Sequence, residues 1–176
     1  MASFRPVTRT EFEQALSPET VQTLRKIQVG FMSGPTLFAL LIGFLSTQPH
    51  PPATPRAIAM VLALSCAHLA VALGGIAASV IVPNRVFSAK KLQGRAANEW
   101  VQAQQTATIM RLGFLEGPAL FGLVVCIQAV FAGVLPRYGV YWLNLASLAV
   151  LLAVGIATLP TRERLVAWFE RSIDTA

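Results

Sequence analysis

Charged residues are scarce in this chain of 176 residues. They make up 12% of it, whereas a soluble domain carries about 25%. Acids are the scarcest, with eight Asp and Glu against fourteen Lys and Arg. Together with a hydrophobic content of 55%, this composition excludes an ordinary water-soluble domain and indicates one domain dissolved in lipid.

Cysteine is also rare, and no metal-ligand or reactive pattern is present. Cys66 and Cys126 belong to no C-x-x-C spacing, so we expect two small buried hydrophobic residues rather than a disulfide or a metal site. The chain has no H-E-x-x-H motif, no glycine-rich phosphate loop, and no Ser, His, Asp or Cys constellation at reactive spacing. We therefore predict no metal, no cofactor and no enzymatic activity.

Four long apolar stretches dominate the sequence. A helix needs about 20 mostly apolar residues to cross the hydrocarbon core of a bilayer. The stretches that meet this requirement are residues 27–45, 57–82, 108–134 and 139–159. The predicted fold class is therefore an all-α membrane protein with four transmembrane helices. Four prolines between residues 47 and 56 make the first outer connection extended.

Basic residues orient these helices. If both termini and the middle loop face the cytoplasm, that side holds eleven basic residues and the other side two. This asymmetry follows the positive-inside rule and predicts cytoplasmic termini in a bacterial inner membrane. The cytoplasmic set is Arg5, Arg9, Arg25, Lys26, Arg85, Lys90, Lys91, Arg95, Arg162, Arg164 and Arg171, and the outer set is Arg56 and Arg137.

The expected partners follow from this distribution. Anionic lipid headgroups should meet Arg85, Lys90, Lys91 and Arg95 at the cytoplasmic face. Nucleic acid is not an expected partner, because the basic residues are spread over three segments and topology explains them. Other membrane subunits, or a second copy of the chain, are expected to cover part of the bundle.

Short amphipathic helices are predicted at both ends. Thr10 with Glu13 has the spacing of a capping box, and Ser17 before Pro18 marks another helix start. After the fourth span, Thr161 caps a helix that we expect on the inner membrane surface. The predicted segments are 1–22 (amphipathic start), 23–83 (first repeat), 84–105 (basic loop), 106–160 (second repeat) and 161–176 (interfacial helix).

The two repeats are defined by one motif that occurs twice. Residues 30–38 read GFMSGPTLF and residues 113–121 read GFLEGPALF, with six of nine positions identical. Each copy lies early in a helix that runs outward. A tandem duplication of a two-helix unit keeps both units in the same orientation, related by an axis along the membrane normal.

The motif contains glycines at the spacing of close helix contacts. Gly30 with Gly34, and Gly113 with Gly117, each form G-x-x-x-G. Small residues at this spacing let two helix backbones approach closely. We therefore predict that all four are helix-packing residues.

A proline follows the second glycine of each copy. Pro35 and Pro118 each remove one helical hydrogen bond, which leaves the carbonyls of Phe31 and Phe114 without their usual partners. We predict packing and kinking roles for both prolines.

The copies differ at one position with chemical consequences. Ser33 in the first copy corresponds to Glu116 in the second, and Glu116 is the only acid within a predicted span. An ionised carboxylate in the hydrocarbon is costly unless it is protonated, paired or hydrated. Glu116 is therefore the candidate ion-binding residue, with Ser33 at the matching place in the other repeat.

Few residues are available to partner Glu116. His68 reaches it if their helices are neighbours, and otherwise bonds to a backbone carbonyl or to water. Arg111 lies five residues earlier on another helix face, where its side chain extends toward the interface. Asn144 and Gln128 are expected to form interhelical hydrogen bonds.

The third span resembles a known family. Residues 106–125 read TATIMRLGFLEGPALFGLVV, which resembles the second helix of the proteolipid, or c, subunit of rotary ATP synthases. That helix begins at the cytoplasmic loop, presents a carboxylate after a small-residue turn and continues as an apolar run. The resemblance implies that Glu116 binds the transported proton or sodium ion.

Two functions remain open from the sequence. The chain is a proteolipid-like subunit of an oligomeric membrane complex, with Glu116 as a proton or cation site. Alternatively, it is a structural or assembly subunit of a larger membrane complex with no transport role.

Overall fold

The computed structural model describes residues 7–88, 92 and 94–174. Within these residues every regular element is a helix. The elements in chain order are α1 (Arg9–Ala15), α2 (Pro18–Ser46), α3 (Pro55–Val86), α5 (Ala97–Phe131), the 3₁₀ helix η1 (Gly139–Leu145), α6 (Ala146–Ala157) and α7 (Arg162–Asp174).

Four helical segments are long and apolar enough to cross a membrane. They are α2, α3, α5 and η1 with α6, of 29, 32, 35 and 19 residues. Large apolar side chains project outward from them, among them Leu40 of α2 and Leu143 of η1, which are 66% and 70% exposed. An apolar surface of this extent suits lipid rather than water, and the prediction of four membrane-length helices is confirmed.

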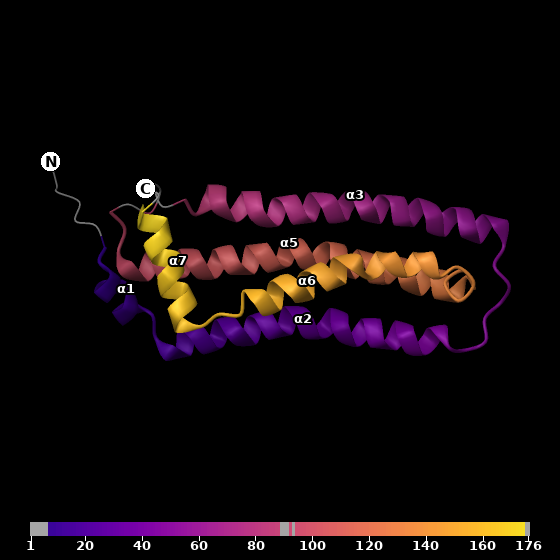
Figure 1. Ribbon diagram of the computed structural model, residues 1–176, viewed down its shortest axis with the longest axis horizontal. Helices are drawn as coiled ribbons and strands as arrows, with labels where there is room; N and C mark the ends of the chain where they lie inside the picture. Colours follow the sequence, from indigo (N-terminus) through magenta and orange to yellow (C-terminus); the bar gives the residue numbers. More distant parts are fainter. Residues whose placement is uncertain (1–6, 89–91, 93, 175–176) are drawn as a thin grey trace.

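The helices form a bundle centred on α5. In Figure 1, α2 and α3 run along opposite edges while α5 and α6 lie between them. The main core is formed largely by α5, with Leu123 and Cys126 fully buried in it. Cys66 is instead exposed on α3, so the prediction that both cysteines are buried is wrong for Cys66, because α3 packs through its other side.

The helices begin and end differently from the spans that hydropathy predicts, most of all at the starts of α2 and α5. Residues 97–105, predicted as part of a loop, form the first turns of α5. They are polar but rich in good helix formers, and Trp100 and Val101 are buried there. The fourth span begins as the 3₁₀ helix η1 before α6 continues it.

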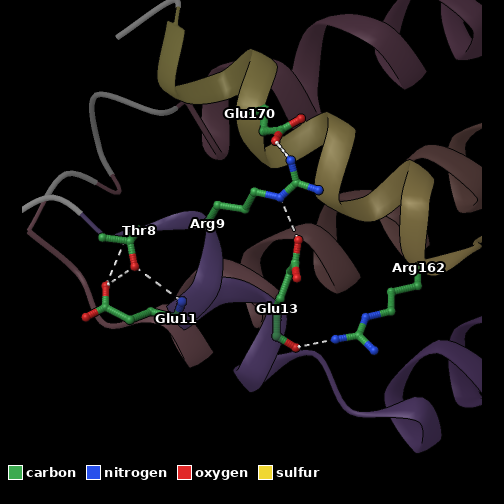
Figure 2. Close-up of polar contacts among 6 residues, drawn as sticks. All are labelled: Thr8, Arg9, Glu11, Glu13, Arg162 and Glu170. Carbon is green, nitrogen blue, oxygen red and sulfur yellow. Dashed lines mark hydrogen bonds and ion pairs between the residues drawn. The ribbon is translucent and has the colours of Figure 1, made fainter.

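Side-chain caps fix the starts of several helices. Thr8 and Glu11 form the capping box of α1 (Figure 2). The predicted box at Thr10 and Glu13 is therefore wrong, and the helix begins two residues earlier than predicted. Both pairs have the T-x-x-E pattern, and Glu13 instead accepts from Arg9. The predicted start of α2 is confirmed, since Ser17 accepts a hydrogen bond from the backbone of Thr20.

A second core lies at the end of the bundle where α1 and α7 meet the first turns of α5. We call this region the terminal cap. The Phe12 and Phe169 rings stack at 4.3 Å between centroids, and the Trp100 ring meets Phe169 edge-on at 5.1 Å. The buried residues of the terminal cap are Phe12, Leu16, Leu24, Leu92, Trp100, Val101, Ala103, Leu165, Val166 and Phe169.

The terminal cap changes the expectation for α7. The sequence predicts a helix here on the inner membrane surface, and in the structure its residues Leu165, Val166 and Phe169 are buried against α1 and α5. Ion pairs reinforce this docking at the rim. Arg9 lies 2.6 Å from Glu13 and 2.8 Å from Glu170 of α7, as Figure 2 shows.

Candidate functional site

The four motif glycines face outward. Gly30, Gly34, Gly113 and Gly117 are all exposed, and a side-chain carbon built on any of them would meet nothing within 4 Å. Among the described residues none of the four packs against another helix, and their helix-packing role stays a prediction. The close approaches between helices occur instead at glycines outside the motif spacing, among them Gly75 and Gly122.

The prolines do take part in packing. Pro35 and Pro118 are both buried inside their helices. A side-chain carbon on Gly75 of α3 would lie 2.6 Å from the carbonyl oxygen of Phe114 and 2.5 Å from the Pro118 ring. Gly75 thus allows α3 to approach α5 at the carbonyl that Pro118 deprives of its helical partner.

Glu116 lies at the border between the buried and exposed sides of α5. It shares its side with Leu112 and Ala119, which are buried, and borders Gly113 and Gly117, which are exposed. The residue is half-buried, and no hydrogen bond or ion pair to it occurs within the described part of the chain. Glu116 is thus a half-buried carboxylate without a partner among the described residues.

None of the predicted partners of Glu116 contacts it through a hydrogen bond or ion pair among the described residues. Ser33 donates to the Gly30 carbonyl of its own helix at 3.2 Å. Arg111 donates from Nε to the carbonyl of Ser79 on α3 at 3.4 Å. Nor does the described part of the chain gather three or more His, Cys, Asp or Glu side chains that would hold a metal ion.

His68 belongs to a separate buried network between α3 and the fourth span. Its Nδ1 lies 3.0 Å from Asn144 Oδ1, and its Nε2 lies 3.0 Å from Ser147 Oγ. Asn144 Nδ2 donates to Ser65 Oγ at 3.0 Å and to the Tyr141 carbonyl at 2.9 Å. Both amide protons are thus used, so Asn144 Oδ1 must accept, which assigns a proton to His68 Nδ1.

A glycine makes room for this network. A side-chain carbon on Gly122 of α5 would lie 2.8 Å from His68 Nε2 and would also collide with the Asn144 carbonyl. The ring of Phe121 meets the imidazole edge-on at 5.8 Å between centroids. The network therefore joins α3, α5 and η1 at one depth, with its polar groups satisfied as a membrane interior requires.

The order hydroxyl, imidazole, amide is also the connectivity of a hydrolase relay. Here the Ser147 hydroxyl is 5% exposed. Besides His68, its neighbours within hydrogen-bond distance are the carbonyl oxygens of Pro118 and Asn144, at 3.2 and 3.5 Å. An oxyanion that develops during acyl transfer is stabilised by hydrogen-bond donors, whereas carbonyl oxygens beside the hydroxyl would repel it. The geometry is therefore that of a structural network.

No family model, curated protein or solved structure matches the chain. Its function must therefore be inferred from its own residues and their geometry.

Sequence reasoning located some of these polar groups and missed others. The prediction of an interhelical hydrogen bond is confirmed for Asn144. Gln128 is exposed and makes no such bond among the described residues. Gln28 was missed, although it is fully buried and donates to the carbonyl of Gly155 in α6. Its signal was a lone amide within an otherwise apolar helix, just inside the start of the first predicted span.

Proposed function

We propose that the chain is a non-enzymatic membrane-spanning subunit that assembles with another transmembrane chain through its outward-facing motif. It has cytoplasmic termini and two parallel two-helix repeats. The observation that carries the proposal is the exposure of Gly30, Gly34, Gly113 and Gly117 with open space beside each. The proposed contact positions, which we call the glycine face, are the outward pair Gly30 and Gly34 of α2 and the outward pair Gly113 and Gly117 of α5.

Energetics supports an external partner for the glycine face. Glycine within a helix costs about 1 kcal/mol relative to alanine. At Gly75 and Gly122 the close approach of another helix offsets this cost, whereas the glycine face receives no such contact from the described residues. A helix from another subunit supplies it, because small residues at this spacing drive association in lipid through close packing.

Glu116 gives the glycine face a polar element. Its carboxylate borders Gly113 and Gly117, so a subunit docked there removes it from contact with lipid. In that interface the carboxylate is either protonated or met by a donor of the partner.

A second candidate function is proton carriage by Glu116 within the same assembly. It is favoured by the lack of a hydrogen-bond partner for Glu116 among the described residues and by the resemblance of residues 106–125 to a proteolipid helix. A carboxylate without a fixed cation is free to exchange a proton when the neighbouring subunit moves.

The assembly proposal is tested with bulky substitutions. Gly34→Leu and Gly117→Leu should abolish the complex that the tagged wild-type chain forms in a mild detergent, measured by native mass spectrometry. Gly74→Leu is the matched control, because Gly74 of α3 is exposed with nothing within 4 Å and lies outside the motif. An intact complex in both motif variants, or equal loss in the control, contradicts the proposal.

Proton carriage is tested separately. A hydrophobic carbodiimide reacts with protonated carboxyl groups in the membrane, so it should modify Glu116 in the wild type and not in Glu116→Gln. No modification of Glu116 between about pH 6 and 8, where an intramembrane carboxyl kept protonated by desolvation would react, eliminates this second function. Assembly through the glycines is unaffected by that result.

A further inference from the structure

A cleft of about 320 Å³ opens between α5, the end of α6 and α7. Its walls carry Gln104 and Arg111 from α5 and Thr158 from the last turn of the fourth span. The α7 wall carries Arg164 and Arg171, with Trp168 between them. Three guanidinium-bearing residues thus line one cleft at the end of the bundle where the terminal cap lies.

The charge of this cleft is of one sign. No Asp or Glu occurs among the described residues that line it. Arg9 and Arg95, by contrast, form ion pairs outside the cleft, Arg9 with Glu13 and Glu170 and Arg95 with Glu99. An electropositive cleft without a carboxylate is a site for an anion.

Two of the arginines are held in place by backbone carbonyls. Arg164 Nη1 donates to the carbonyls of Ala157 and Leu159, at 2.8 and 3.2 Å, at the end of α6. Arg111 Nε donates to the Ser79 carbonyl at 3.4 Å. A guanidinium has five N–H donors, so both side chains are positioned by the protein and keep donors for a ligand.

The apolar part of the wall identifies the source of the anion. Leu112, Leu165 and Trp168 line the same cleft, and the cleft lies where the fourth span ends and α7 crosses α5. Tryptophan is enriched at the level of lipid headgroups, and basic pockets between helices at this depth bind anionic headgroups. We propose that this cleft binds the phosphate of an anionic phospholipid, with Arg111 and Arg164 as its donors and Trp168 beside the glycerol and upper acyl chain.

The experiment titrates purified full-length chain in neutral detergent with dioctanoyl phosphatidylglycerol and follows the rise in thermal midpoint. Dioctanoyl phosphatidylcholine tests the need for net negative charge, and glycerol phosphate tests the need for acyl chains. We expect only phosphatidylglycerol to raise the midpoint. Arg111→Gln should weaken its apparent affinity about tenfold, the value of one charged hydrogen bond.

Arg137→Gln is the matched control, because it removes the same charge at the opposite end of the bundle, where Arg137 lies over the Tyr138 ring. Its affinity for phosphatidylglycerol should equal that of the wild type. Equal weakening in both variants would mean attraction to overall charge and overturns the proposal. A rise with glycerol phosphate at the same concentrations overturns the lipid source, since the cleft would then take a free anion.

If Arg111→Gln does not fold, as judged by loss of helical circular dichroism, the titration is repeated with Arg111→Lys. Lysine keeps the charge but loses the planar fork. It should bind phosphatidylglycerol more weakly than the wild type by severalfold. Wild-type affinity in the folded lysine variant, with no loss in Arg164→Lys, overturns the assignment of these two donors.

Discussion

The terminal cap and the membrane bundle are held together by different means. The cap buries large aromatic rings against one another, with Phe169 in contact with both Phe12 and Trp100 and ion pairs at its rim. In the bundle, neighbouring helices approach most closely at glycines, among them Gly75 and Gly122. The difference follows from the solvent, because burial of apolar surface drives packing in water, whereas lipid is as apolar as the side chains themselves.

The largest expected effect separates the two regions directly. Phe169→Ala removes the ring that meets both Phe12 and Trp100, and should destabilise the terminal cap by about 4 kcal/mol. We expect trypsin to cleave within α7 much faster, while the bundle keeps its helical circular dichroism. Phe131→Ala is the control, because Phe131 is 58% exposed at the other end of α5. Equal protection of α7 in the Phe169 variant and the wild type would contradict this account.

The next effect compares two glycines of one helix. Gly122→Ala places a methyl group against His68 and the Asn144 carbonyl, and should destabilise the bundle by about 2 kcal/mol through overpacking. Gly113→Ala meets nothing within 4 Å and should stabilise the isolated chain by up to about 1 kcal/mol through helix propensity. Unfolding in mixed micelles measures both. Changes of the same sign in the two variants would refute the contrast.

A smaller effect is expected from the polar network of the bundle. His68→Ala removes the partner of Asn144 Oδ1 and Ser147 Oγ, and should cost about 1 kcal/mol, since interhelical hydrogen bonds in membranes are individually weak. Leu69→Ala is the control, because its side chain is 60% exposed. A double-mutant cycle with Asn144→Ala should give a positive coupling energy. Strict additivity would mean that the two side chains do not stabilise each other.

The sequence predicted the four long helices because length and hydropathy alone decide whether a helix crosses a bilayer. It predicted that Asn144 bonds between helices, because a buried amide must find a partner. It did not reveal that Gly75 and Gly122, rather than Gly113 and Gly117, make the close contacts within the chain. The spacing G-x-x-x-G places two glycines on the same side of a helix. Which helix, if any, packs against that side depends on the tertiary arrangement.

The terminal cap was the region least predictable from sequence. Residues 97–105 lack the hydropathy of a span, so α5 appeared to begin later than Ala97. Their burial depends on Phe12 and Phe169, which lie far away in the chain. Hydropathy windows measure local composition, whereas this core is assembled from residues of several segments that are far apart in the sequence.

The smallest expected effect is the pH dependence of a hydrogen-bonded carboxylate in the first turn of α7. The backbone N–H of Glu163 and the Thr161 hydroxyl donate to the Glu163 carboxylate and lower its pKa below the ordinary value of 4.5. Because the folded form lowers this pKa, the carboxylate adds stability above pH 4.5, and that stability is lost as pH falls through the folded pKa. Amide hydrogen exchange in α7 should therefore be slightly slower in the wild type than in Glu163→Gln at neutral pH, and the two rates should become equal in acid. A constant ratio of the two rates from neutral pH to well below 4.5 would show that the Glu163 charge does not stabilise the docked helix.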